Sequence, residues 1–284
     1  MNASDPQNAQ EQKLITEAQL NWNQHWKKIT QLPASPATTG FSGAVKRTLR
    51  RSGGLELGYR IVKKEIRRNN GQVIMEAGCG TGEMSLRMAL EGKSLFTLDT
   101  SRSALDYVKR CAKRSGIKVN IIQGSVLHLP FREAVFDATF NVGVLDHLGP
   151  QNRIEAAREM VRTLKPLGRT VILINSSRAF VHRLAVRCAE KKGLWKFGFK
   201  DAVHSLAKEV AERLRGCRIR EYERGFLSQF EFLHYCIPQA AVIKRLFFRT
   251  FYLLTFPFGF LNRFAGQYLI TVIEKSEVKD RRHR

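Results

Sequence analysis

The stretch Glu76-Ala77-Gly78-Cys79-Gly80-Thr81-Gly82 decides how this chain of 284 residues folds. It follows the apolar run Val73-Ile74-Met75 and opens into residues 83–90, whose pattern is helical. A short buried strand, a glycine turn and a helix are therefore expected in direct succession. Glycine lacks a Cβ, so its backbone can approach a ligand that any other residue would push away. This order predicts a nucleoside-binding crevice at the end of the first strand.

An acidic residue closes the next apolar segment, Leu95-Phe96-Thr97-Leu98-Asp99. A carboxylate at the end of the second strand suits the two ribose hydroxyls of an adenosine. The three glycines of the turn have the spacing G-x-G-x-G, whereas the dinucleotide fingerprint is G-x-G-x-x-G. Glu76 also precedes the turn, where it would repel a pyrophosphate and attract a cation. The pattern therefore favours S-adenosylmethionine, which carries a sulfonium and an amino group.

Apolar segments alternate with helical patterns along the rest of the core. Strands are predicted at residues 73–76, 94–98, 118–122, 136–142 and 169–175, and helices at 83–91, 102–115 and 151–165. Such alternation is typical of a parallel sheet with helices on both faces, which binds its ligand at the carboxyl ends of the strands. Residues 217–222 and 268–273 are expected as the sixth and seventh strands. The predicted fold class is α/β, a Rossmann-like seven-stranded, mostly parallel sheet.

The chain resembles the class I S-adenosylmethionine-dependent methyltransferases, in the broad group that methylates small molecules, quinones and lipids. The likeness runs from Val73 to Ile174 and returns at the last predicted strand. Besides the glycine turn it is carried by Leu129-Pro130-Phe131, by residues 141–148 and by residues 162–168. The resemblance implies S-adenosylmethionine as cofactor and an antiparallel seventh strand.

The cofactor is expected to lie at the carboxyl ends of the first four strands. The residues expected to bind it are Glu76, Gly78, Cys79, Gly80, Thr81, Gly82, Asp99, Thr100, Ser125, Val126, Asn141 and Gly143. Two positions depart from the family. Ser125 stands where the family usually has an acid for the adenine amino group, so a hydroxyl or backbone hydrogen bond is expected there. Leu167 replaces a turn glycine, and Gly168 is expected to suffice for the turn.

The candidate catalytic residue is His147, which follows the fourth strand at the ligand-binding edge. Methyl transfer from a sulfonium is an in-line displacement, so the main task is to align the acceptor with the methyl group. A base is needed only if the acceptor must lose a proton, a role that histidine suits near neutral pH. A structural or cofactor-shell role for His147 is equally open. His234 and Tyr235 are second-line candidates.

The formal net charge of +23 is unevenly distributed. Residues 41–72 carry +7 and residues 176–268 carry +10, whereas residues 73–175 carry only +4. A basic surface attracts the phosphates of nucleic acid or of anionic lipid, or serves solubility alone. The five cysteines are widely spaced and include no C-x-x-C pair. Reduced thiols, a cytoplasmic protein and no metal site are therefore expected.

An N-terminal arm and a basic lead-in helix are expected over residues 1–70, before a methyltransferase domain over residues 71–284. Trp22 and Trp26 lie four residues apart in this arm and share one face if it is helical. They either cover the cofactor as a lid or, in the favoured interpretation, dock the arm on the domain. Insertions on the acceptor side are expected at about 176–202 and 224–267.

The second insertion contains an aromatic run, residues 246–261, with Lys244, Arg245, Arg249 and Arg263 around it. The run is too short and too interrupted to cross a bilayer, which takes ~20 apolar residues. Three interpretations stay open: a core helix under the sheet, contact with anionic lipid or a hydrophobic substrate, and a dimer interface.

The leading hypothesis is a methyltransferase that uses S-adenosylmethionine and acts on a hydrophobic small-molecule or lipid-like acceptor, with an anionic membrane surface as a candidate partner. One alternative is an RNA methyltransferase, acting on ribose or base, which the charge favours. Nucleic acid is the less favoured partner, because Asn141-Val142-Gly143-Val144 lacks the prolines usual for methylation of base amino groups. The other alternative is a non-catalytic relative that binds the cofactor without turnover.

Overall fold

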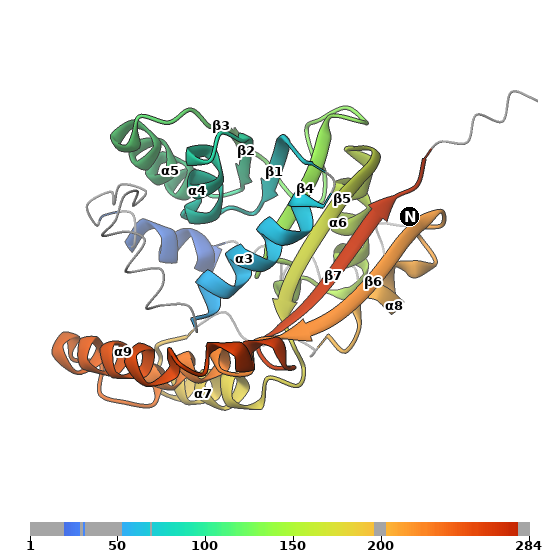
Figure 1. The fold of residues 1–284 in the computed structure, drawn as a ribbon. Coiled ribbons are helices and arrows are strands. Elements are labelled where there is room, and N and C mark those ends of the chain that lie inside the picture. Colours follow the sequence, from blue (N-terminus) through green and yellow to red (C-terminus); the bar gives the residue numbers. More distant parts are fainter. Residues whose placement is uncertain (1–19, 29–30, 32–52, 69, 196–202, 278–284) are drawn as a thin grey trace, which may run out of the picture.

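The computed structural model describes residues 20–28, 31, 53–68, 70–195 and 203–277. These residues form a sheet of seven strands in the order β3-β2-β1-β4-β5-β7-β6, in which β7 runs antiparallel to both of its neighbours (Figure 1). The predicted Rossmann-like α/β fold, including the antiparallel seventh strand, is confirmed. The strands are β1 (Val73–Ala77), β2 (Ser94–Asp99), β3 (Asn120–Gln123), β4 (Phe136–Val142), β5 (Leu164–Asn175), β6 (Cys217–Arg224) and β7 (Tyr268–Lys275).

Helices cover both faces of the sheet. The helices of one face pack against Ile74 of β1, and those of the other against Met75, because successive side chains of a strand point to opposite sides. The first face carries α3 (Gly54–Arg67), α4 (Glu83–Leu90) and α5 (Arg102–Ser115), and the second carries α6 (Pro150–Arg162) and α8 (Leu206–Ala211). Ile74 and Met75 are both completely buried. Burying each such side chain contributes about 1.5–3 kcal/mol, so the sheet holds the two layers together.

The turn before the main part of β5 differs from the expectation that Gly168 would suffice. Leu167 itself adopts the left-handed conformation, with φ of 61°. Gly168 is needed for a different reason, since a Cβ there would lie 2.8 Å from the Lys165 carbonyl oxygen. β5 also begins at Leu164, five residues before the predicted start at residue 169, and the register with β4 shifts at this point. The turn is thus built by both residues of the Leu-Gly pair.

The register of the last three strands brings two distant connections to one edge of the sheet. Asn175, the last residue of β5, pairs with Tyr268, the first residue of β7. Tyr268 pairs in turn with Arg224, the last residue of β6. The segments that follow β5 and β6 therefore both leave from the carboxyl edge, where β1 and β4 also end.

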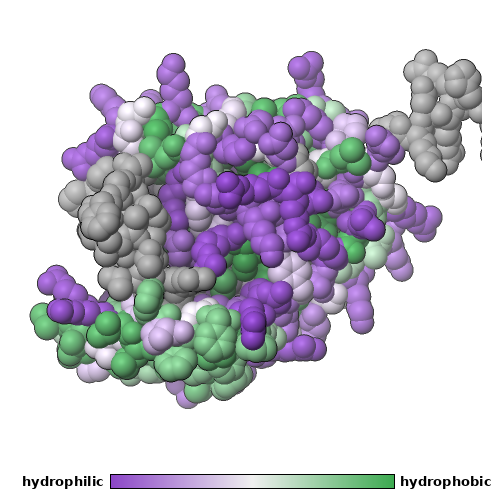
Figure 2. Space-filling view, in the orientation of Figure 1, coloured by the Kyte–Doolittle hydropathy of each residue, from purple (hydrophilic) through white to green (hydrophobic). Residues whose placement is uncertain are grey.

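These two segments form a helical layer at that edge, seen along the bottom of Figure 1. Its elements are α7 (Phe180–Lys191), the 3-10 helix η2 (Ser228–Tyr235), α9 (Ala241–Thr255) and the 3-10 helix η3 (Gly259–Arg263). None of the residues of α9 is buried, so the interpretation of the aromatic run as a core helix under the sheet is wrong. Figure 2 shows hydrophobic side chains along this part of the surface. Among the described helices, none combines the length and apolar character needed to span a bilayer.

Candidate active site

The glycine turn between β1 and α4 has an unusual backbone. Gly78, Gly80 and Gly82 have φ angles of 78°, 51° and 64°, in the left-handed region that side chains rarely adopt. A Cβ on Gly82 would lie 2.7 Å from the Val108 side chain, so this glycine lets α5 pack closely behind the turn. A Cβ on Gly80 would lie 2.7 Å from the ring of Trp26. Gly82 thus packs against α5, whereas Gly78 and Gly80 line a cavity.

Asp99 ties the glycine turn to the end of β2. One carboxylate oxygen accepts a hydrogen bond from the Gly80 backbone N–H at 2.8 Å, and the other accepts one from the Ser101 N–H at 2.9 Å. Burial raises the pKa of Asp99 from its ordinary value, while these backbone hydrogen bonds act in the opposite direction. The carboxylate thereby fixes the two loops that border the cavity.

Glu76 lies one residue before the end of β1 and is 5% exposed. Its Oε2 accepts hydrogen bonds from the Ser85 hydroxyl at 2.5 Å and from the Ser85 N–H at 3.2 Å. Burial nevertheless raises the pKa of Glu76 to about 8, because the charged form is poorly solvated there. At neutral pH this carboxyl is mostly protonated, and a cation placed beside it would favour its ionisation.

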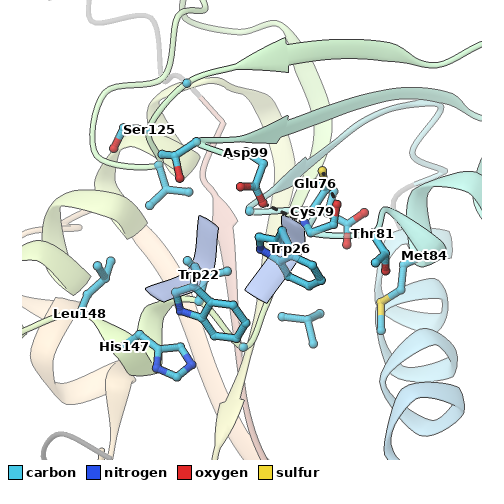
Figure 3. A pocket seen from close by; sticks show the side chains of 18 of the residues that line it. Trp22, Trp26, Glu76, Cys79, Thr81, Met84, Asp99, Ser125, His147 and Leu148 are labelled. Carbon is cyan, nitrogen blue, oxygen red and sulfur yellow. Dashed lines mark hydrogen bonds between the residues drawn. The ribbon is translucent and has the colours of Figure 1, made fainter. Parts of the chain in front are cut away.

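The turn, Asp99 and Glu76 border a cavity of about 350 Å³ at the carboxyl edge of the sheet (Figure 3). This volume lies in the range of small-molecule sites. The lining residues are Trp22, Trp26, Leu55, Glu76, Gly78, Cys79, Gly80, Thr81, Glu83, Met84, Asp99, Thr100, Gly124, Ser125, Val126, Leu127, Val142, Gly143, Val144, His147 and Leu148. The cavity thus combines the polar groups of the turn and Asp99 with apolar side chains such as Leu148 and Val144, which lies beside Gly78.

Two tryptophans from the helix over residues 20–28 enter this cavity. The rings of Trp22 and Trp26 stack with centroids 5.6 Å apart, and the Trp22 ring contacts that of His147 edge-on at 5.2 Å. Figure 3 shows Trp26 beside Asp99 and Cys79, and Trp22 beside His147. The arm therefore contacts the domain at the cavity, a position in which the two tryptophans both dock the arm and cover the cavity.

Ten of the twelve residues predicted to bind the cofactor line the cavity, and Gly82 and Asn141 do not. Gly82 faces α5, as described above. Asn141 is completely buried in β4, and its side-chain amide donates a hydrogen bond to the Ala77 carbonyl of β1. The Asn141 side chain thus joins β4 to β1 beneath the glycine turn, and its contact with the cofactor stays a prediction.

The wall formed by residues 124–127 differs in character from the wall around Asp99. The Ser125 hydroxyl accepts a hydrogen bond from the Leu127 N–H at 3.2 Å and so stabilises its own turn. Val126 and Leu127 add apolar surface to the cavity. This wall offers backbone groups and a flat apolar surface to a ligand, in place of the acid that the family usually has here.

His147 lies on the 3-10 helix η1 (Leu145–His147), which follows β4, and lines the cavity. The neighbouring Asp146 is 7% exposed and accepts a hydrogen bond from the Asn175 side chain at 2.7 Å. His234 and Tyr235 are not in the cavity lining. The His234 ring packs against that of Phe248 of α9 with centroids 5.0 Å apart, and the Tyr235 ring packs against that of Trp195 with centroids 6.1 Å apart.

Several lining residues were not singled out by sequence reasoning. Leu55 comes from the first turn of α3, Met84 from the first turn of α4, and Leu148 from the loop after η1. Each is an apolar residue in an otherwise ordinary helical or loop pattern. Nothing in the local sequence separates such residues from core positions, because their place in the wall depends on how distant segments meet.

Comparison with known proteins matches residues 75–172 to the family described as a methyltransferase domain. The chain is 21% identical over 164 residues to a ubiquinone biosynthesis O-methyltransferase of Rickettsia conorii, covering 56% of each protein. It is 32% identical over 107 residues to a tRNA (carboxymethyluridine(34)-5-O)-methyltransferase of Arabidopsis thaliana, covering 37% of this chain and 24% of that protein.

Residues 75–172 of the chain therefore carry a methyltransferase domain. Its fold is shared with a protein solved in work on the conversion of a disulfide bond into a thioacetal group during echinomycin biosynthesis. That similarity has a TM-score of 0.52 at 19% identity and covers 77% of this chain and 81% of the other. The chain spans about half the length of the first curated relatives it matches, with 56%, 45% and 40% coverage.

S-adenosylmethionine is the cofactor of this domain, and the residues of the cavity fit it. Gly78 and Gly80 of the left-handed turn line the cavity without a Cβ, and Asp99 presents a carboxylate at the end of β2. Glu76 supplies a buried carboxyl group whose raised pKa a cationic ligand would lower. Both acids and the glycine turn thus suit a ligand that carries positive charge.

Binding of S-adenosylmethionine is expected to depend on pH through Glu76. The cationic ligand favours the ionised carboxylate, so below about pH 8 binding must release the proton. The affinity is expected to rise with pH, by up to about tenfold per unit, and to level off above about pH 8. Isothermal titration calorimetry across this range measures it. Glu76→Gln should bind more weakly and lose the pH dependence, whereas Glu83→Gln, another change in the cavity lining, should keep it.

Tryptophan fluorescence is expected to report cofactor binding. Of the three tryptophans in the chain, Trp22 and Trp26 line the cavity and Trp195 does not. Adding S-adenosylmethionine should change the emission of the wild-type protein and of the matched control Trp195→Phe. The double variant Trp22→Phe/Trp26→Phe should lose most of the response. A response of equal size in the double variant would show that the helix over residues 20–28 does not meet the cofactor.

Proposed function

We propose that this protein transfers a methyl group from S-adenosylmethionine to a hydrophobic small-molecule or lipid-like acceptor. The observation that carries the proposal is the composition of the cavity described above. Asp99 and the glycine turn line it together with apolar side chains, among them Val144 beside Gly78 and Leu148 next to His147. One space therefore offers a cradle for the cofactor and a hydrophobic place for the acceptor beside it.

Within this proposal each side of the cavity has a task. Asp99 accepts hydrogen bonds from the ribose hydroxyls, and the wall at Ser125 and Val126 holds the adenine. Glu76 lies at the charged end of the cofactor, whose sulfonium supplies an activated methyl group. The remaining contribution is alignment, because holding two reactants in line can be worth about 7–11 kcal/mol of the barrier. Trp22 and Trp26 cover the cavity and exclude water from the aligned pair.

His147 is assigned the task of removing a proton from the acceptor. Its ring lines the apolar side of the cavity and is held edge-on against Trp22. A hydroxyl acceptor becomes a better nucleophile as it loses its proton, and a positioned base typically contributes about 10²–10⁴ in rate.

The relatives support two acceptor classes. The similarity to ubiquinone biosynthesis O-methyltransferases, found in several bacteria, favours a hydrophobic acceptor. The similarity to tRNA methyltransferases and the net charge of +23 favour RNA as the second candidate. The apolar cavity wall supports the first, since a ribose or base would leave its polar groups without partners there. An anionic membrane surface is the proposed partner, because lipid-like acceptors reside in bilayers.

The acceptor class is expected to emerge from label transfer. The purified protein is incubated with host extract and methyl-labelled S-adenosylmethionine, and label is counted in organic, small aqueous, RNA and protein fractions. Label is expected in the organic fraction. Gly80→Arg serves as the blank, because its side chain would fill the cavity beside Trp26. Label in RNA would replace the proposed acceptor by the second candidate, and cofactor binding without any transfer would indicate a non-catalytic relative.

The role of His147 is expected to show as a loss of rate without a loss of binding. His147→Gln should reduce transfer about 10²-fold or more. Its affinity for S-adenosylmethionine, measured by calorimetry, should stay within about twofold of wild type. A parallel loss of affinity and rate would instead assign His147 to the cofactor shell.

A further inference from the structure

The outer face of α9 and η3 exposes large apolar side chains. We call this set the docking face: Val242, Leu246, Leu253, Leu254, Phe258 and Phe260, each between 52% and 75% exposed. Figure 2 shows their hydrophobic surface along the lower edge of the molecule, over the elements that Figure 1 labels α9. A surface that gathers so many apolar side chains is typical of a place where a protein meets a partner or a membrane.

The opposite face of α9 packs against the rest of the domain. The Phe248 ring packs on His234 of η2, and the Tyr252 hydroxyl donates a hydrogen bond to Glu231. The other carboxylate oxygen of Glu231 accepts a hydrogen bond from the Gly54 backbone N–H at 2.8 Å, at the start of α3. These contacts orient α9 on the domain and turn the docking face outward.

Positive charge surrounds the docking face. Residues 241–265 contain Lys244, Arg245, Arg249 and Arg263 and no acidic residue. Within the part of the chain that the structure describes, the salt bridges involve none of these four cations. The Arg263 guanidinium lies over the ring of Phe260, 5.7 Å from its centroid. Apolar and cationic side chains are thus interleaved on one surface.

The dimensions of α9 suit a helix that lies along a membrane. Its 15 residues correspond to about 22 Å, which is shorter than the hydrocarbon core of a bilayer. Cations within the helix would also be costly at the centre of a bilayer, but they reach the headgroups from a helix that lies at the interface. Leucine and phenylalanine side chains are typical of the apolar face of such an interfacial helix.

We infer that the docking face binds the surface of an anionic lipid bilayer, an inference that rests on the proposed lipid-like acceptor. Charge complementarity selects this occupant. A second copy joined through the same face by two-fold symmetry would place the cations of one subunit against those of the other. RNA would leave the leucines and phenylalanines without apolar partners. Anionic lipid offers phosphates for the cations and acyl chains for the apolar side chains.

Binding of the docking face to a bilayer would bring the carboxyl edge of the sheet, where the cavity lies, close to the membrane. α9 and η3 connect β6 to β7 at the carboxyl edge, the same edge at which the cavity lies. Gly54, which is hydrogen-bonded to Glu231 beneath α9, is adjacent to Leu55 in the cavity wall. A hydrophobic acceptor therefore has a short path from the membrane to the apolar side of the cavity.

The test is co-sedimentation of the full chain with vesicles. Vesicles of equal parts phosphatidylglycerol and phosphatidylcholine are expected to bind the protein, and pure phosphatidylcholine at least about tenfold less. Leu246→Glu/Leu253→Glu should weaken binding to the anionic vesicles at least about tenfold, since it places two charges in the apolar face.

The contribution of the cations is tested separately. Arg245→Gln/Arg249→Gln should reduce the preference for phosphatidylglycerol. Leu167→Glu is the matched control, an exposed leucine at the turn that leads into the sheet-forming part of β5, and should bind as wild type.

Circular dichroism and calorimetry with S-adenosylmethionine show that each variant is folded, and neither needs the acceptor. Equal binding of wild type and Leu246→Glu/Leu253→Glu to vesicles, or no binding by wild type, would overturn the inference. So would a dimer by light scattering that the same double variant dissociates while vesicles have no effect. Vesicle binding needs no turnover, so its failure would leave the label-transfer result intact, and failed label transfer would leave vesicle binding intact.

Discussion

The hydrogen bonds of the Asp99 carboxylate hold the candidate site together. By accepting from Gly80 on one side and Ser101 on the other, Asp99 joins the loop after β1 to the loop after β2. The left-handed backbone of the glycine turn is costly for any residue with a side chain, so the turn needs glycine for its shape and Asp99 for its position. The walls of the cavity are built on either side of these two loops. α4 begins directly after the glycine turn, and Ser125, which follows β3, lines the cavity as well.

The antiparallel insertion of β7 between β5 and β6 sets the rest of the architecture. Because β5 and β6 both end opposite Tyr268, the chain must add α7, η2, α9 and η3 at the carboxyl edge. These four helices therefore lie at the same edge of the sheet as the cavity, where they can contribute to an acceptor site. The turn at Leu167 and Gly168 lies at the other edge of the sheet, away from the cavity. A chain of this topology can change its acceptor without disturbing the cofactor cradle.

The sequence predicted the strands of the sheet well, because short apolar runs and the glycine turns beside them can be recognised from neighbouring residues alone. It also placed the glycine turn and Asp99 at one cavity, since both follow strands that can be recognised. Asn141 does not line this cavity, because its direction within β4 depends on the neighbouring β1. The core-helix interpretation of α9 was wrong, because apolar residues look alike in a sequence whether they are buried or exposed. The contribution of Trp22 depends on an arm more than 100 residues from His147, a contact that no local pattern contains.

The groups inside the cavity are acidic, whereas the exposed face of α9 and η3 is basic. This separation of charge suits the two ligands proposed for them. Glu76 and Asp99 place acidic groups inside a poorly solvated cavity, where they favour a positively charged ligand and disfavour phosphates. The cations of α9 and η3 lie outside on an exposed face, where they attract anionic surfaces but are screened over distances of about 10 Å at moderate salt. Were the signs exchanged, the cavity would repel its cofactor and the docking face would repel anionic lipid. A net charge of +23 is therefore compatible with a cationic cofactor, because the excess charge lies outside the cavity in which that cofactor binds.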